Sequence, residues 1–158
     1  MNHYIVFAAL ALCGLNASCH KVEAATVSQQ DTIVWMTDFA AAKAQAAAES
    51  KPLFLSFSGS DWCGWCKRLD KEVLSTPEFQ KALSQKMIFV QVDFPKKPLP
   101  DALKAQNDAL MKEYKVRGFP TIIVLDANGN KLGTLGYKEG GPVPFIQKVQ
   151  ELINAGSR

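Results

Sequence analysis

Two cysteines, Cys63 and Cys66, stand three positions apart within the stretch 59–69, GSDWCGWCKRL. Residues 52–57 before them form an apolar run typical of a buried strand, and apolar residues at helical spacing follow, so the pair is predicted at a strand-to-helix turn. A thiol in the first turn of a helix faces unpaired backbone N–H groups and the positive end of the helix dipole, which favour the thiolate. Cys63 is therefore the candidate nucleophile. Cys66, one turn deeper, is expected to turn toward the interior as the thiol that resolves a mixed disulfide.

The composition is that of a single soluble globular domain, because 158 residues with 47% hydrophobic and 21% charged side chains can bury a sizeable core. The net charge of +3 is too small and too evenly spread to favour nucleic acid as a partner. We therefore expect no nucleic-acid binding.

The first 25 residues differ in kind from the rest. Residues 5–15 are an apolar run that is too short to span a bilayer; small residues follow it, and residues 22–24 are a passable cleavage site. This pattern predicts a signal peptide over residues 1–25, cleaved near Ala24, and an exported, periplasmic domain over residues 26–158. A lipoprotein anchored through Cys19 is the alternative, although the Leu expected three residues before an acylated Cys is absent.

Removal of such a leader would leave the mature chain with Cys63 and Cys66 as its only cysteines and with no histidine. A ring closed three residues apart constrains an unfolded chain little, so a redox pair is favoured over a structural staple. A Cys-His hydrolase would lack its imidazole base. Zinc normally takes four ligands, so a metal carrier would need a dimeric site, and we expect neither a metal nor a cofactor.

The remaining chain alternates strand and helix patterns. The first half is expected to form an edge strand at 33–35, a helix capped by Thr37 and reaching about residue 50, and a strand at 52–57. A helix from 63 that breaks near 75–78, a second helix to 85 and a strand at 87–92 follow. The second half is expected to form a helix capped by Asp101 and reaching about 114, a hairpin of 122–125 and 131–135 around an Asn-Gly turn, and a last helix after Pro142. This order predicts an α/β layout with parallel crossovers first and an antiparallel hairpin last. Ligand chemistry in such sheets lies beyond the carboxyl ends of the parallel strands, where Cys63 falls.

Two motifs in this order, WCGWCK at 62–67 and VRGFPT at 116–121, resemble the thioredoxin superfamily over about residues 37–155. The longer form SGSDWC at 58–63 is more similar to exported bacterial thioredoxin-like disulfide reductases. The resemblance implies a thioredoxin fold, a central mixed sheet flanked by helices, here with an extra N-terminal segment. It also implies that Pro120 is cis and faces the cysteines, and that the backbone of Phe119 pairs with an extended substrate. The substrate-binding residues expected on this basis are Trp62, Gly64, Trp65, Gly118, Phe119 and Pro120.

The chain departs from the family pattern at three positions. Ser56 occupies the place of a buried Asp, and Phe89 the place of the Lys that commonly accompanies it. Proton transfer to and from Cys66 must then use water or another group. Trp65 replaces a Pro, either as a surface aromatic at the rim of the site or as a substrate contact.

The resulting hypothesis is a thiol-disulfide oxidoreductase that reduces disulfides of exported proteins and is itself reduced by an unidentified membrane electron donor. A reductase is favoured over an oxidase because little besides the helix N-terminus stabilises the Cys63 thiolate. Lys67 and Arg68 are expected to point to water, and Asp61 disfavours a further negative charge. The alternatives are an isomerase or oxidase on the same fold, a metal carrier, or a holdase that uses the aromatic rim.

Overall fold

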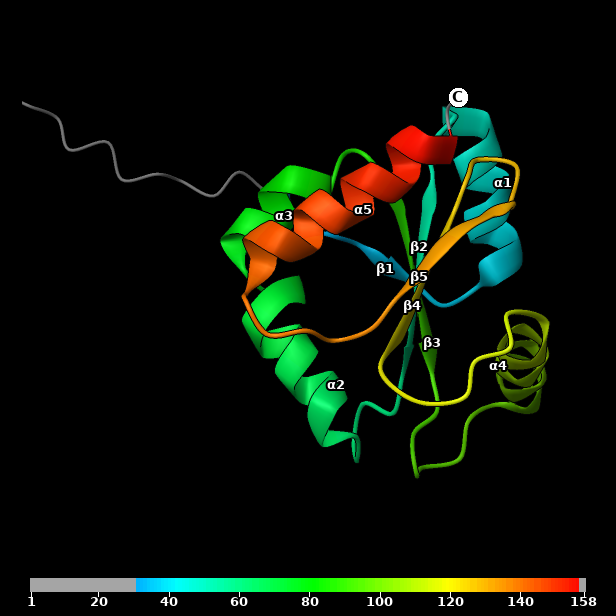
Figure 1. The fold of residues 1–158 in the computed structure, drawn as a ribbon. Coiled ribbons are helices and arrows are strands. Elements are labelled where there is room, and N and C mark those ends of the chain that lie inside the picture. The colour runs from blue at the N-terminus through cyan, green and yellow to red at the C-terminus, as the bar shows by residue number, and fades with distance from the viewer. Residues whose placement is uncertain (1–30, 157–158) are drawn as a thin grey trace, which may run out of the picture.

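The computed structural model describes residues 31–156, so the predicted leader, Cys13 and Cys19 lie outside the described residues. The elements in chain order are β1 (Trp35–Met36), α1 (Phe39–Glu49), β2 (Leu53–Ser58), α2 (Gly64–Leu69), the π-helical turn η2 (Asp70–Leu74), α3 (Pro77–Leu83), β3 (Ile88–Asp93), α4 (Asp101–Glu113), β4 (Thr121–Leu125), β5 (Lys131–Leu135) and α5 (Pro142–Gly156). Figure 1 shows helices on both faces of one sheet, with α2, α3 and α5 on one side and α1 and α4 on the other. The predicted mixed sheet flanked by helices is confirmed.

The five strands lie in the order β1-β3-β2-β4-β5. β3 runs parallel to both β1 and β2, whereas β4 is antiparallel to β2 and to β5. The parallel register of β2 and β3 ends with Ser58 beside Asp93, and the antiparallel register sets Phe57 beside Thr121 at the start of β4. The carboxyl ends of β2 and β3 and the start of β4 therefore lie at the same end of the sheet. The loops that leave the sheet there carry the motifs predicted to do chemistry.

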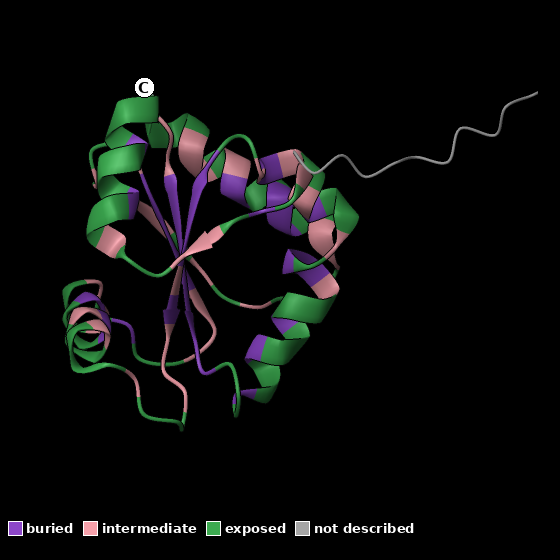
Figure 2. Ribbon diagram, turned by 180° about the vertical axis from the view of Figure 1, so that it is seen from behind, coloured by how far each residue is buried: buried purple, intermediate pink, exposed green. Residues whose placement is uncertain are grey.

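Two apolar layers, one on each side of the sheet, make the core. Alternation along β2 sends Phe54 into the layer under α2, α3 and α5, and sends Leu53, Leu55 and Phe57 into the layer under α1 and α4. Figure 2 shows the consequence, because the central strands are buried along almost their whole length while the helices are buried on one side only. The sheet thus forms a rigid base for the loops at its edge.

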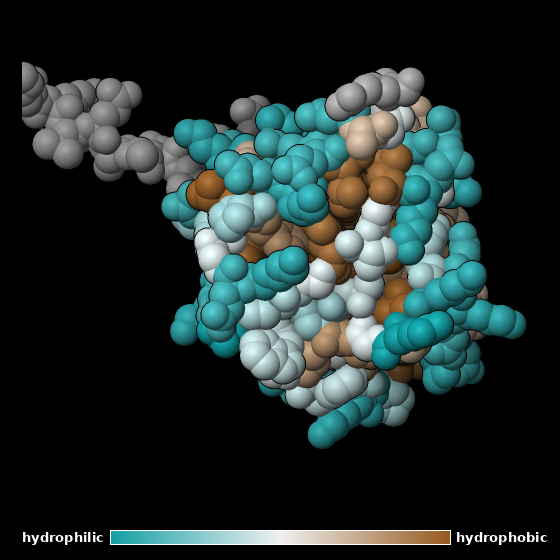
Figure 3. All heavy atoms as spheres, viewed as in Figure 1, coloured by the Kyte–Doolittle hydropathy of each residue, from teal (hydrophilic) through white to brown (hydrophobic). Residues whose placement is uncertain are grey.

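α5 packs closely on β5 because β5 carries a glycine where a side chain would collide. A Cβ on Gly133 would lie 2.5 Å from a methyl carbon of Leu152, and a Cβ on Gly156 would lie 2.3 Å from one of Leu132. Figure 3 shows an apolar area between α5 and β5, surrounded by mainly hydrophilic side chains. This contact covers the part of the sheet that the β4–β5 hairpin forms.

Several helix boundaries differ from the sequence expectation. The N-cap of α1 is Asp38 rather than Thr37, because the Asp38 carboxylate accepts the N–H of Ala41 at 3.0 Å. Asp101 is the first residue of α4 and not its cap, a position where its charge still complements the helix dipole. The predicted cap Thr76, with Pro77 in the first turn of α3, is confirmed.

The strands also depart in detail from the prediction. β1 covers Trp35–Met36 rather than 33–35. The hairpin has no two-residue turn, since Leu125 pairs with Lys131 and the Asp126 carboxylate accepts the N–H groups of Asn128 and Asn130 at 2.8 Å. Gly129, with φ of 90°, supplies the left-handed conformation that this longer loop requires. Within residues 31–156, no helix combines the length and the apolar character needed to cross a bilayer.

The aromatic cluster around Phe54 is expected to dominate stability. Its ring lies 5.2 to 6.1 Å from those of Trp35, Phe79 and Phe89, and it is fully buried. Phe54→Ala should lower the free energy of unfolding by about 3–5 kcal/mol, because it leaves a large cavity. Val34→Ala, at a side chain 78% exposed, should change it by less than about 0.5 kcal/mol. Urea denaturation measures both, and equal effects would contradict this account of the core.

Candidate active site

Cys63 and Cys66 form a disulfide, with their Cα atoms 5.2 Å apart. Cys63 is the N-cap of α2 in an extended conformation, and its Sγ accepts the backbone N–H of Cys66 at 3.1 Å. The predicted position of Cys63 at a helix start is therefore confirmed. Backbone N–H groups aimed at this sulfur favour its thiolate form after reduction.

The two cysteines differ in what surrounds them rather than in exposure. Each is 6% exposed, so the disulfide form presents little of either sulfur to solvent. Cys66 lines a cavity of 530 Å³ that lies under α2, together with residues of β2 and β3. The expectation that Cys66 turns toward the interior agrees with this position.

One wall beside the cysteines is built on Trp62, which is 45% exposed but held in place. Its indole N–H donates to the carbonyl oxygen of Phe94 at 2.7 Å, and its ring meets that of Phe119 edge to face with centroids 6.0 Å apart. Phe119 in turn stacks on Phe94 at 5.1 Å. Gly59 permits this packing, because a Cβ there would lie 2.4 Å from the Trp62 ring.

Hydrogen bonds tie the loop that carries Cys63 to the end of β3. The Asp93 carboxylate accepts both the N–H and the hydroxyl of Ser60, at 2.8 and 2.5 Å. The Asp61 carboxylate accepts the N–H of Lys96, while the Lys67 ammonium donates to the Asp61 carbonyl oxygen at 2.9 Å. Lys67 is exposed, as the sequence predicts, and its hydrogen bond closes the loop.

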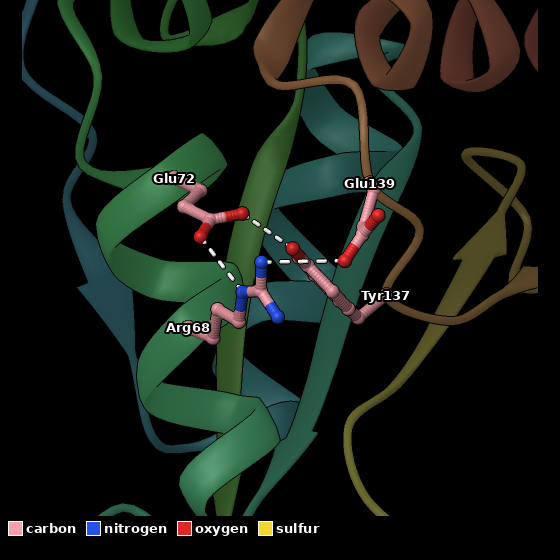
Figure 4. Close-up of polar contacts among 4 residues, drawn as sticks. All are labelled: Arg68, Glu72, Tyr137 and Glu139. Atoms are coloured by element: carbon pink, nitrogen blue, oxygen red, sulfur yellow. Dashed lines mark hydrogen bonds and ion pairs between the residues drawn. The ribbon is translucent and has the colours of Figure 1, made fainter.

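A second wall is built on Trp65, which directly precedes Cys66 in the chain, and Figure 4 draws Arg68, Glu72, Tyr137 and Glu139 from it. Trp65, 57% exposed, lies against Tyr137 with ring centroids 5.6 Å apart. The Arg68 guanidinium carbon lies 5.5 Å from the Trp65 ring and 5.4 Å from the Tyr137 ring. Arg68 pairs with Glu72 at 2.8 Å and Glu139 at 3.3 Å, and the Tyr137 hydroxyl donates to Glu72. Arg68 is exposed, as predicted, but these contacts hold it in place at the surface.

This cluster shifts the titration of its acidic members. The hydrogen bond from Tyr137 and then that from Arg68 hold the pKa of Glu72 below its ordinary value. The same hydrogen bond to Glu72, with desolvation, raises the pKa of Tyr137. The ionised Glu72 and the neutral Tyr137 therefore stabilise each other.

The second predicted motif lies beside the cysteines. The bond between Phe119 and Pro120 is cis, and Pro120 lines both the cavity that Cys66 lines and a separate surface groove that includes Trp65 and Tyr137. Within residues 31–156 the backbone N–H of Phe119 makes no hydrogen bond. A Cβ added to Gly64 or Gly118 would meet nothing within 4 Å, so both glycines border open space.

The structure thus brings Trp62, Trp65, Phe119 and Pro120 together around the cysteines, with Gly64 and Gly118 next to them in the chain. It adds Arg68, Glu72, Tyr137 and Glu139. The spacing of Arg68 and Glu72 at i and i+4 on a helix could have indicated their pairing. Tyr137 stands 65 positions from Glu72 in the chain, and no sequence signal connects them. No group of three or more His, Cys, Asp and Glu side chains that could hold a metal ion occurs in the described part of the chain.

The family model for a thioredoxin-like domain matches residues 39–141, and the chain belongs to this family. The chain is 34% identical over 116 residues to the disulfide bond reductase DsbH of Chlamydia pneumoniae, covering 73% of this chain and 70% of that one. It is 35% identical over 135 residues to the thioredoxin-related protein DsbJ of the same organism, covering 83% of this chain but only 39% of that longer protein.

A solved structure titled DsbH Oxidoreductase superposes with a TM-score of 0.75 at 31% identity, covering 90% of this chain and 95% of the other. The predicted thioredoxin fold is therefore confirmed over nearly the whole described chain. A thioredoxin from Thermus thermophilus, at 21% identity and a TM-score of 0.62, supports the fold alone.

The wall around Tyr137 is expected to loosen in acid. Because the pKa of Glu72 is lowered in the folded protein, its contacts are complete above the ordinary carboxyl pKa of about 4.3 and are lost as the pH falls through the lowered value. Tyr137→Phe should raise the pKa of Glu72 toward the ordinary value, as carboxyl chemical shifts would report. Tyr114→Phe, on the other face of the sheet, should leave it unchanged; an unaltered pKa in Tyr137→Phe would contradict the role of the hydroxyl.

Proposed function

We propose that the protein is a thiol-disulfide oxidoreductase that works as a reductase of protein disulfides through Cys63 and Cys66. The observation that carries the proposal is the disulfide at the start of α2, where the N–H of Cys66 points at the Cys63 sulfur. The similarity to a protein named as a disulfide bond reductase supports reduction, and not oxidation, of the substrate.

In the proposed cycle the reduced protein begins with a Cys63 thiolate. This thiolate attacks one sulfur of a substrate disulfide, a mixed disulfide forms, and the other substrate sulfur leaves as a thiolate. The Cys66 thiolate then attacks the Cys63 sulfur, which forms the intramolecular disulfide and releases the second substrate thiolate. Two electrons from a dithiol donor regenerate the pair.

The substrate is proposed to lie as an extended chain across the cysteines, between the two aromatic walls. Its backbone would pair with the unbonded N–H of Phe119, in the manner of a strand added to a sheet edge. The open space at Gly64 and Gly118 lets that chain approach the disulfide closely. Trp62 and Trp65 would bound the path, and Pro120 would form its floor.

The charges around Cys63 favour a reductase over an oxidase. Oxidising power requires strong stabilisation of the nucleophile's thiolate. The two nearby cations are engaged elsewhere, since Lys67 donates to a backbone carbonyl oxygen and Arg68 pairs with two carboxylates. The helix N-terminus is left as the main stabilising feature of the Cys63 thiolate, as in thioredoxin.

We further propose that the chain is exported and receives its electrons from a membrane donor. The apolar run at 5–15 supports a leader, and these residues lie outside the described part of the structure. A cleaved leader and the alternative lipid anchor at Cys19 predict different masses for the mature chain. The holdase alternative would use the same aromatic walls without the redox step.

Cysteine variants separate the redox function from passive binding. Cys63→Ser should reduce the rate of insulin disulfide reduction to the uncatalysed level, because the nucleophile is lost. Cys66→Ser should retain substrates as mixed disulfides on Cys63, visible as thiol-sensitive adducts by mass spectrometry. If the parent protein shows no reductase activity and Cys63→Ser still binds substrate, the holdase alternative is favoured. A reduction potential more oxidising than about −180 mV in glutathione buffers would contradict the reductase direction.

Gly118→Ala tests the substrate path without disturbing the fold. The added methyl group meets no protein atom within 4 Å, so the free energy of unfolding should change by less than about 0.5 kcal/mol. It should nevertheless lower kcat/KM for protein disulfides by about tenfold, equivalent to about 1.4 kcal/mol, because it occupies the proposed substrate position. Asn128→Ala, in the distant hairpin loop, serves as the control. Unchanged kcat/KM in Gly118→Ala would exclude this path.

A further inference from the structure

The cavity of 530 Å³ beneath α2 is the feature that the substrate surface leaves unexplained. It lies between α2 and the strands β2 and β3, and Cys66 is part of its lining. The Cys66 side chain is only 6% exposed, so the cavity is where its sulfur can meet solvent. The residues opposite Cys66 therefore determine how a proton reaches that sulfur.

The sheet face opposite Cys66 is polar at the carboxyl ends of the strands. In the parallel register Ser56 lies beside Gln91, and two residues further on Ser58 lies beside Asp93. Because side chains two apart on a strand share a face, all four project to the same side of the sheet, and all four line the cavity. One step earlier on the same face the pair is aromatic and belongs to the core.

Three of these polar side chains have no protein partner. Ser56 is 4% exposed and Ser58 is 8% exposed, and their hydroxyl groups and the Gln91 amide make no hydrogen bond to any residue in 31–156. Every side-chain nitrogen or oxygen in that range that is fully shielded from solvent has a hydrogen-bond partner. Because these three groups have none, they are not fully shielded, and the cavity is the space that they reach. A cavity of this size, with these polar groups in its lining, holds on the order of ten waters, which satisfy such groups.

A resolving cysteine needs a route for its proton. Cys66 must lose a proton before it attacks, and the family's buried Asp is replaced by Ser56, whose hydroxyl does not accept a proton at neutral pH. We propose that water in this cavity, positioned by Ser56 and Gln91, carries the proton between Cys66 and solvent. The inference rests on the proposed function, because only a resolving Cys66 requires such a route.

The Cys66 S–H gives its proton to cavity water, and the resulting thiolate attacks the Cys63 sulfur of the mixed disulfide. The Cys63–Cys66 bond forms as the bond from Cys63 to the substrate sulfur breaks. The substrate leaves as a thiolate and takes a proton from solvent. On re-reduction Cys66 leaves as a thiolate and recovers its proton from the same water.

The charged groups that face the cavity are Lys67 and Asp70 from the helical side and Asp93 from β3. Asp93 accepts two hydrogen bonds from Ser60, and Asp70 accepts one from the Ser75 hydroxyl at 3.0 Å. Lys67 and Asp70 are exposed, and Asp93 is half-buried, so they stand where bulk water enters. Ser56 and Gln91 do not titrate, and they are the residues that can position water deeper in the cavity.

The test uses the reduced protein and an aromatic disulfide reagent whose leaving thiolate is coloured. The first phase of colour release reports attack by Cys63, and the second, absent in Cys66→Ser, reports attack by Cys66. Ser56→Ala and Gln91→Met should slow the second phase about tenfold at neutral pH and raise its pH midpoint by about one unit. The first phase should keep its rate, and Ser56→Thr, which retains the hydroxyl, should restore the second.

The proposal is overturned if the second phase keeps the parent rate in both Ser56→Ala and Gln91→Met. It is also overturned if both phases slow equally, because that would indicate a general structural effect. A parent protein that shows both phases with the predicted variant effects but fails to reduce insulin would overturn the proposed function and leave the proton route standing. The two failures are therefore distinguishable.

Discussion

The parallel register of β2 and β3 is the constraint on which the rest of the site depends. Because Ser58 and Asp93 end the two strands side by side, the loop that carries Cys63 and the loop that follows β3 leave the sheet together. Asp93, Lys96 and Phe94 can then hold Ser60, Asp61 and Trp62 by hydrogen bonds. The start of α2, and with it the direction of the Cys66 N–H, is fixed by these contacts. A slip of one residue between the strands would disrupt all of them at once.

The two walls beside the disulfide are held by different forces. Trp62 is fixed by its hydrogen bond to the Phe94 carbonyl oxygen and by its ring contact with Phe119, which in turn stacks on Phe94. These contacts depend little on pH or salt. Trp65 is fixed by Tyr137 and by an exposed network of Arg68 and carboxylates, which both acid and salt weaken. The Trp62 wall is therefore expected to keep its structure over a range of pH and salt, whereas the Trp65 wall is expected to loosen in acid or at high salt.

Local patterns in the sequence were sufficient for much of this structure. The alternation of strands and helices, the cap at Thr76 and the helix start at Cys63 each follow from a few neighbouring residues, and all were found. The cap of α1 was placed one residue early, at Thr37, because the neighbouring Asp38 is also an acceptor side chain. The cap of α4 was placed one residue late, at Asp101, because Pro100, which takes the cap position, has no acceptor side chain to indicate it. The Tyr137 wall and the cavity beside Cys66 were beyond local reasoning, because their members come from separate elements and meet only when the sheet has formed. The sequence did indicate the missing acid at Ser56, but not the space that surrounds it.

The half-exposed positions of Trp62 and Trp65 have an optical consequence. Each indole neighbours one of the cysteines in the chain, and a disulfide quenches the emission of a nearby indole. Trp35 lies further from the cysteines in the chain, on the edge strand β1, where it is partly buried against Phe54 and Phe89. The intrinsic fluorescence of the unlabelled chain therefore contains a signal from Trp62 and Trp65 that brightens as the disulfide opens, added to the emission of Trp35. The protein carries its own indicator of its redox state.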